Sequence, residues 1–195
     1  MDMWPAFRKS TLKSENANQA EIMYDKFHII GHLQKAMDKL RKSEYARLSG
    51  RGRRFIKGQR YALLSHKRNL TLTGRRGLKI LLAANKRLNT GYILKEQFEQ
   101  LWEYKTPVGA RRFFERWRDA LRWKRLEPYQ KFAELIEKHW DGIIAYFQND
   151  IEVMLGFVEG FNNKIRAIQH RAYGLQDEEY LRLKILTSML PRIAD

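Results

Sequence analysis

The sequence lacks several features that define large classes of proteins. It has no cysteine among 195 residues, which excludes disulfides, thiolate metal sites and thiol nucleophiles. No apolar run approaches the roughly 20 residues that a membrane-spanning helix needs, and the N-terminus has no basic stretch followed by an apolar one. We therefore expect a protein of a reducing compartment, the cytoplasm, without a membrane partner.

Acidic residues are missing from one long stretch of the chain. From Tyr45 through Lys95 there is no Asp or Glu but there are 14 basic residues, in a chain whose formal net charge is +16. We call residues 45–95 the basic segment. Such a stretch repels itself, and phosphate binding with release of counterions is the usual reason for the arrangement. The pattern predicts a nucleic-acid partner.

What is present suits a folded protein. Hydrophobic residues make up 44% of the chain and charged residues 31%, and the aromatic residues include five Trp, nine Tyr and ten Phe. A chain of this size can bury most of its apolar surface in one domain, or in one domain with a helical appendage. The composition excludes a disordered chain.

Hydrophobic periodicity predicts a mainly helical chain with a short αβ opening. The short apolar run Ala20–Tyr24 favours a buried strand ending at Asp25, and Ile151–Leu155 favours a second extended segment. Apolar residues at three- and four-residue steps, together with turn and capping residues, predict helices over 27–48, 53–66, 78–88, 90–104 with Thr90 as its cap, 108–124, 128–146 and 176–190, and a helix that opens at Gly156 and carries Glu159.

An aromatic and basic stretch, Ala110–Leu126, is a second candidate for contact with nucleic acid. Its aromatic residues could stack on unpaired bases. Their helical spacing favours core packing instead, with Phe113, Phe114, Trp117, Leu121 and Trp123 including the inward face. Together with the basic segment, this stretch supplies the predicted DNA contacts, which are Arg51, Arg53, Arg54, Lys57, Arg60, Lys67, Arg68, Arg75, Arg76, Arg111 and Arg112.

Three acidic residues are candidate metal ligands, and each could also have an ordinary structural role. Asp2 suits the end of a core strand or a flexible terminus, and Glu159 shares a polar helix face with Asn163 and Arg166 that could be ordinary solvated surface. Asp25, His28 and His32 lie near one helix face and could bind metal, but a helix N-cap at Asp25 with partly buried imidazoles that steady the core is the favoured interpretation.

Five strings along the chain resemble the ISL3 family of bacterial insertion-sequence transposases. They are DMW from Asp2, EIMYDKFHI from Glu21, KAMDKLRKSEYARL from Lys35, GFVEGFNNKIRAIQHRAYG from Gly156 and DEEYLRLKILTSML from Asp177. The resemblance covers nearly the whole chain and keeps the order and spacing of the strings.

The resemblance implies an Asp-Asp-Glu triad that binds two Mg²⁺ ions and cuts and joins DNA, with transposon ends and target as partners and a homo-oligomeric parent protein. It implies an α+β, mostly α, fold in which an incomplete ribonuclease-H-like core, residues 1–26 and 150–195, surrounds a basic helical insertion, residues 27–149. By the same resemblance the catalytic metal ligands are Asp2 and Glu159, and the supporting residues are Asp25, His28, Asn163 and Arg166.

The triad's first aspartate has no counterpart in this sequence. We therefore expect the chain alone to bind DNA with strong salt dependence and not to cut it. Two other classes stay open: a non-catalytic helical nucleic-acid-binding protein, and a basic amphipathic protein on anionic membranes, which the large apolar stripes disfavour.

Overall fold

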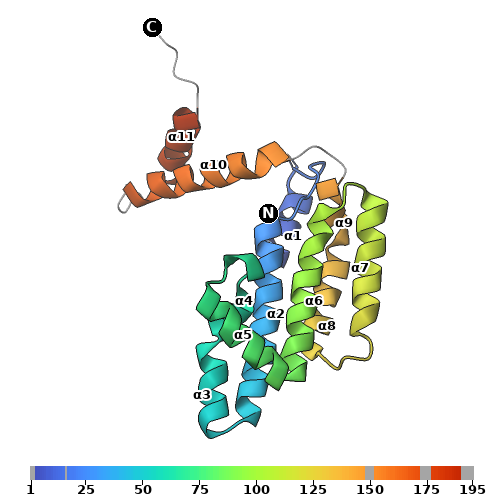
Figure 1. Cartoon of the computed structure of the whole chain (residues 1–195). Helices are drawn as coiled ribbons and strands as arrows, with labels where there is room; N and C mark the ends of the chain where they lie inside the picture. The colour runs from blue at the N-terminus through green and yellow to red at the C-terminus, as the bar shows by residue number, and fades with distance from the viewer. Residues whose placement is uncertain (1–2, 16, 148–151, 172–176, 190–195) are drawn as a thin grey trace. The chain divides into compact units, whose positions relative to one another are not determined.

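The computed structural model describes residues 3–15, 17–147, 152–171 and 177–189, without the side chains of 152–159, 162 and 189. The chain forms two compact units, residues 1–149 and residues 150–195. In each unit, all the regular secondary structure of the described residues is helical (Figure 1).

The first unit contains most of the helices. Its α helices are α1 (Pro5–Lys13), α2 (Lys26–Arg47), α3 (Gly50–Gly58), α4 (Arg60–Leu64), α5 (Leu72–Ala84), α6 (Lys86–Glu99), α7 (Pro107–Leu121), α8 (Glu127–Lys138) and α9 (Trp140–Ile144). Short 3₁₀ helices are η1 (Lys67–Asn69), η2 (Gln100–Glu103) and η3 (Ala145–Phe147).

The core of the first unit lies among α2, α6, α7 and α8, which run side by side in Figure 1. Gly91 allows α2 and α6 to approach closely, because a methyl group there would lie 2.4 Å from a methyl of Leu40. Two buried polar groups are satisfied by backbone. The Trp117 indole N–H donates to the Leu94 carbonyl at 2.9 Å, and the Tyr129 hydroxyl donates to the Gly91 carbonyl at 2.6 Å.

Helices α3 and α4 pack on one side of α2, and α5 packs on α4 and α6 (Figure 1). The turn between α2 and α3 uses Gly50 at φ 53°, a conformation that glycine adopts without steric cost. Helix α3 buries only Ile56, and α5 buries only Leu78 and Leu81. Most positions on these two helices are therefore available for contact with a ligand.

The predicted α+β fold class is wrong, because the described residues contain no β-strand and no ribonuclease-H-like sheet. The run Ala20–Tyr24 is not helical, but it packs on α9 instead of pairing with another strand. The Tyr24 N–H donates to the Gly142 carbonyl at 3.1 Å, and the Tyr24 ring lies edge-on to His139 at 5.1 Å. The predicted extended segment at Ile151–Leu155 is also wrong over Glu152–Leu155, which begins α10 (Glu152–Arg171).

The starts of α2, α5, α6 and α7 follow residues whose side chains cap the helix. The predicted N-cap at Asp25 is confirmed, since its carboxylate accepts the Phe27 N–H at 2.8 Å. Thr90 is not a cap: α6 begins earlier, where the Asn85 side chain accepts the Leu88 N–H at 2.9 Å. The predicted helix 53–66 is divided between α3 and α4.

The second unit contains α10 and α11 (Glu178–Met189). The Lys164 ammonium of α10 donates to the Ser188 carbonyl of α11, which joins the two helices. Residues 3–15 and 17–26 pack within the first unit, and the predicted grouping of 1–26 with 150–195 stays a prediction.

Candidate nucleic-acid interface

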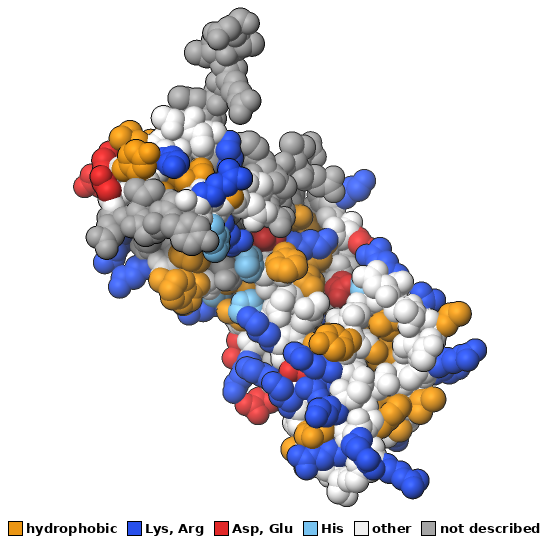
Figure 2. Space-filling model, turned by 90° about the vertical axis from the view of Figure 1, so that its left-hand side faces the viewer, with side chains coloured by type: hydrophobic (Ala, Val, Ile, Leu, Met, Phe, Trp, Pro, Cys, Tyr) orange, Lys and Arg blue, Asp and Glu red, His pale blue; other side chains and the backbone are white. Residues whose placement is uncertain are grey.

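The basic segment places most of its cations on the surface. Twelve of its 14 basic side chains are exposed, whereas Arg87 is half-buried and Lys95 is buried. Within the described part of the chain, only two of the twelve form ion pairs: Arg47 with Glu44 and Arg60 with Asp38. Figure 2 shows Lys and Arg side chains, with hydrophobic ones between them, over the lower part of the face that carries α3. The charge excess of the sequence is therefore a charge excess of the surface.

A basic groove between α2 and α8 adjoins this surface. Its volume is about 500 Å³, and its lining includes five cations, Lys35, Lys39, Lys42, Arg60 and Lys131. The first three lie on α2 at steps of four and three residues, which puts them on one helix face. These three lysines were not predicted from the sequence, because they lie outside the acid-free stretch. Their spacing at steps of four and three residues is the signal that could have predicted them.

Asp38 is an acid in the lining of the groove, and it is engaged by its neighbours. Its carboxylate accepts from Arg41 at 2.8 Å and lies 3.2 Å from the Lys42 ammonium. Burial would raise the pKa of Asp38, but the hydrogen bonds from Arg41 and Lys42 outweigh it and hold that pKa below its ordinary value. The groove therefore combines an ionised, neutralised acid with Lys35 and Lys39, while Lys131 lies 2.6 Å from the Glu127 carboxylate.

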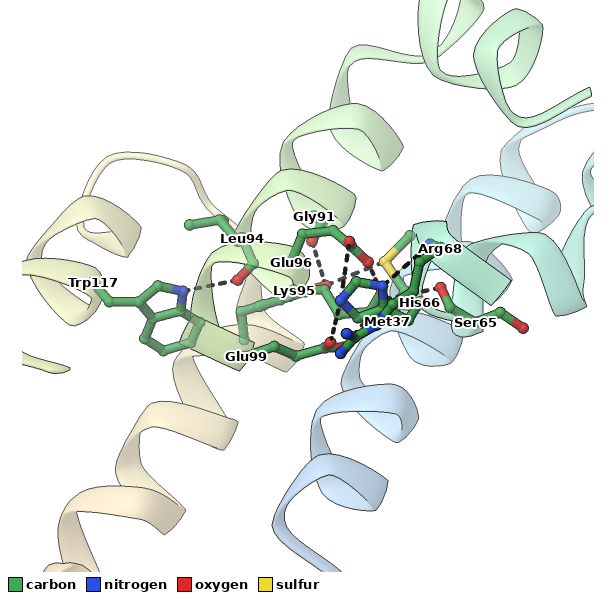
Figure 3. Close-up of polar contacts among 11 residues, drawn as sticks. Met37, Ser65, His66, Arg68, Gly91, Leu94, Lys95, Glu96, Glu99 and Trp117 are labelled. Atoms are coloured by element: carbon green, nitrogen blue, oxygen red, sulfur yellow. Dashed lines mark hydrogen bonds and ion pairs between the residues drawn. The ribbon is translucent and has the colours of Figure 1, made fainter. Parts of the chain in front are cut away.

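Lys95 is the exception in the basic segment. Its side chain is fully buried, and its ammonium donates to Glu96 at 2.7 Å, to the Ser65 carbonyl at 3.1 Å and to Glu99 at 3.5 Å (Figure 3). Lys95 therefore cannot contact DNA. It ties α6 to the end of α4, and so positions the exposed cations of η1.

His66, Glu96 and Glu99 are the one group of three potential metal ligands among the described residues. Figure 3 shows the His66 ring beside the carboxylates of Glu96 and Glu99. His66 Nδ1 accepts the Arg68 N–H at 3.3 Å, so in the neutral ring Nε2 carries the proton and donates to Glu99 at 3.2 Å. Both carboxylates already hold the Lys95 ammonium. The group therefore suits an internal cation and does not fit a divalent metal.

The cations of α7 have a different environment from those of the basic segment. Arg111 lies 2.8 Å from Glu115 and 2.7 Å from Glu137, and Arg118 lies 2.7 Å from Glu137. Arg112 is exposed, and no ion pair links it to an acid in the described ranges. Of the predicted contacts on this helix, Arg112 is thus the freer one.

The aromatic residues of α7 follow the predicted core packing with one exception. Phe114, Trp117 and Leu121 are buried and Phe113 packs against the core. Trp123 is not on the inward face, because α7 ends at Leu121 and the side chain is 85% exposed.

The predicted catalytic acids fall where the structure gives little detail. Asp2 lies outside the described residues, and Glu159 lies on α10 with its side chain outside the description. On the same helix, Asn163 and Arg166 are exposed, and the Arg166 guanidinium donates to the Asn163 side chain at 3.4 Å. In the first unit, His28 Nε2 lies 4.0 Å from the Asp25 carboxylate. The roles of these residues stay predictions.

Comparison with known proteins identifies the family. The profile of the ISL3-type DDE transposases, described as transposase, matches residues 1–185. The chain belongs to this family of transposases. No solved structure matches the chain.

Two curated relatives illustrate the match. The transposase for insertion sequence element IS1001 of Bordetella parapertussis is 34% identical over 170 residues, which are 86% of this chain and 41% of that protein. The transposase for insertion sequence element IS1557 of Mycobacterium tuberculosis is 26% identical over 180 residues, 80% of this chain and 40% of that protein. The chain spans about two fifths of the length of these relatives.

The structure also bears on the expected membrane behaviour. No helix in the described ranges combines the length and the apolar character that crossing a bilayer requires.

Proposed function

We propose that this transposase chain binds DNA through the basic segment and supplies part of a metal site for DNA cleavage and strand transfer. In this proposal, residues 27–149 contact transposon or target DNA, and residues 1–26 and 150–195 carry the catalytic positions. The observation that carries the DNA part is the exposure of 12 of the 14 cations of the basic segment, of which only two pair with an acid among the described residues.

The proposed phosphate contacts follow from this exposure. Arg51, Arg54 and Lys57 lie on α3, a helix that buries a single side chain. The other contacts are Arg53, Arg60, Lys67, Arg68, Arg75, Arg76 and Arg112, with Arg111 weakened by its two carboxylate partners. Phosphate contacts position a protein on DNA without reading sequence, so this surface supports affinity and not base specificity.

The metal part of the proposal rests on family membership. Asp2 and Glu159 would be carboxylate ligands for Mg²⁺, which when bound stabilises the attacking and leaving oxygens of phosphoryl transfer. Asp25 is proposed to support the site, with His28, Asn163 and Arg166, because its carboxylate already caps α2. The expected homo-oligomer of the parent protein stays a prediction.

The DNA part is tested by the salt dependence of binding. Fluorescence anisotropy with a short labelled duplex should give log K against log[KCl] with a slope steeper than about −4 between about 50 and 200 mM, since each phosphate contact contributes about −0.9. Polyglutamate in place of DNA is the control for simple anion attraction. A slope shallower than about −2, or equal binding to polyglutamate, would contradict the DNA proposal.

The metal part needs a separate readout. Fe²⁺ with peroxide cleaves a protein backbone near a site where iron replaces Mg²⁺, so we expect cuts near residues 2 and 159. Glu159→Gln should remove them, whereas the matched control Glu178→Gln, an exposed acid on α11, should not. Identical cleavage of the Glu159→Gln chain would favour the alternative function, a nucleic-acid-binding protein in which these acids are incidental.

A further inference from the structure

The loop between α7 and α8 presents an aromatic side chain to solvent. We call residues 122–125, with the sequence Arg-Trp-Lys-Arg, the tryptophan loop. Trp123 is 85% exposed, more than any other large hydrophobic side chain in the described ranges. An exposed indole ring contributes none of the stabilisation that its burial in the core would give. We therefore expect a ligand to cover the ring.

The tryptophan loop is held in place on both sides. Leu121 before it and Leu126 after it are buried in the core. The Lys124 N–H donates to the Leu121 carbonyl at 3.0 Å, and the Arg87 guanidinium donates to the Arg125 carbonyl at 3.4 Å. Arg125 has φ 51°, a left-handed conformation that is strained for a residue with a side chain. The turn that exposes Trp123 is therefore maintained in spite of the backbone strain at Arg125.

Positive charge surrounds the exposed ring. Arg122, Lys124 and Arg125 are exposed, and no carboxylate forms an ion pair with them in the part of the chain that the structure describes. The Arg122 guanidinium carbon lies 5.9 Å from the centre of the Trp123 ring. An aromatic face among unneutralised cations fits a ligand that has both flat rings and negative charge.

The tryptophan loop also leads directly into the basic groove. Pro128 and Lys131, in the first turns of α8, line that groove together with Lys39 of α2. Figure 1 shows the α7–α8 loop at the same end of the first unit as the junction of α5 and α6, where Lys86 is exposed. A strand whose phosphates follow these cations would bring a base to the ring.

We propose that Trp123 stacks on an unpaired base of DNA whose backbone runs along the α2–α8 groove. The inference rests on the proposed DNA binding and adds the type of DNA: single-stranded, gapped or locally opened duplex. Duplex DNA with every base paired offers no free face to the indole ring, so the ring should distinguish the two forms.

The test compares one duplex with a version that carries a short unpaired bubble, using fluorescence anisotropy. Trp123→Ala should weaken binding to the bubble about tenfold, equivalent to about 1.4 kcal/mol, and change binding to the paired duplex less than about twofold. Trp123→Phe should keep most of the bubble affinity. Trp4→Ala is the matched control, because Trp4 is also exposed, at 59%, but directly precedes α1 and lies beside Phe7.

The outcomes separate this inference from the proposed function. If the wild-type chain binds neither DNA, both fail. If it binds paired DNA but Trp123→Ala leaves bubble binding unchanged, or weakens both DNAs equally, only the stacking inference fails. If Trp123→Ala abolishes binding to phosphatidylserine vesicles but leaves binding to the bubble DNA unchanged, the ring contacts a lipid surface and the inference is overturned. Unchanged thermal unfolding of the variant shows that the effect is not misfolding.

Discussion

The basic segment and helix α7 are both rich in cations, but they present charge differently. On α3 and α5 the exposed Arg and Lys side chains lack acid partners in the described part of the chain, whereas Arg111 and Arg118 of α7 share Glu137 of α8. Glu137 lies 26 residues after Arg111 in the sequence. Surface charge is therefore decided by which helices pack together, and a cation-rich stretch is a binding surface only where packing brings no acid to it.

Removing charge from α3 should have the largest effect. Replacing Arg51, Arg54 and Lys57 by Gln is expected to weaken DNA binding about a hundredfold near physiological salt and to reduce the salt slope by about 2.7, because three phosphate contacts are lost. The matched change on α7, Arg111→Gln with Arg118→Gln, should alter the slope by less than about 1. Equal slopes for the two variants would remove the distinction between the regions.

Lys95→Met should affect stability and not the DNA surface. The substitution leaves the carboxylates of Glu96 and Glu99 without their buried partner, and we expect a loss of about 2 kcal/mol in the free energy of unfolding. Urea denaturation measures this loss. The exposed Lys79→Met should cost less than about 0.5 kcal/mol in the same assay. A Lys95→Met chain as stable as wild type would show that the cluster around His66 does not hold α4.

Neutralising Glu137 should make α7 behave more like the basic segment. Glu137→Gln releases Arg111 and Arg118 from their shared partner, and we expect DNA affinity to rise about threefold with a slightly steeper salt slope. Glu134→Gln changes the net charge equally on the same helix, but no ion pair with Glu134 is found among the described residues. If both variants bind DNA equally well, net charge and not local pairing explains the gain.

The smallest effect is expected from an ion pair outside both regions. Arg8 lies 2.6 Å from Asp141 and, chiefly by its hydrogen bond, holds the pKa of Asp141 below the ordinary value, with burial opposing. A lowered folded-state pKa means that the pair stabilises above the unfolded pKa, near 3.8, and that this contribution is lost as pH falls through the lower folded pKa. Because Asp141 is over half exposed, Asp141→Asn should cost about 0.5 kcal/mol or less at neutral pH.

Urea denaturation at neutral and at acidic pH checks this expectation. The cost of Asp141→Asn should begin to shrink as pH falls below the unfolded pKa, near 3.8, and should disappear below the lower folded pKa, where the wild-type carboxyl is also neutral. Asp119→Asn, an exposed acid on α7, serves as the control and should show little cost at either pH. A cost that stays constant with pH would mean that the amide disturbs packing and that the charge is not the cause.

Local signals predicted the long helices well. The three- and four-residue spacing from Phe27 predicted α2, and Asp25 caps it because a short acceptor side chain suits an N-cap. On α7, the spacing of Phe114, Trp117 and Leu121 correctly predicted the buried face. These signals are local, so a single sequence is sufficient to read them.

The errors come from properties that depend on distant parts of the chain. A short apolar run such as Ala20–Tyr24 can pair with a strand or pack on a helix, and only the partner decides. Trp123 was misplaced because the helical period continues in the sequence beyond Leu121, where the helix itself ends. Lys95 was counted as surface charge, although Glu96 and Glu99 beside it were signs of an internal ion pair.

For the candidate site, the sequence predicted the basic surface but not its extension into the groove. Acid-free composition marks Arg51, Arg54 and Lys57 directly. The groove cations Lys35 and Lys39 lie on a helix that also carries Asp38, so composition hides them until α8 brings Lys131 alongside. The roles of Asp2 and Glu159 depend on family membership, and they stay predictions.

The close approach of α2 and α6 at Gly91 connects the interior of the first unit with the basic surface that we propose binds DNA. Lys95 lies one turn of α6 after Gly91, and its ammonium donates a hydrogen bond to the carbonyl of Ser65, which precedes η1. A methyl group at position 91 would push α6 outward, and the hydrogen bond between Lys95 and Ser65 would pass this displacement to Lys67 and Arg68. The buried substitution Gly91→Ala would then change the affinity for nucleic acid without touching a surface residue.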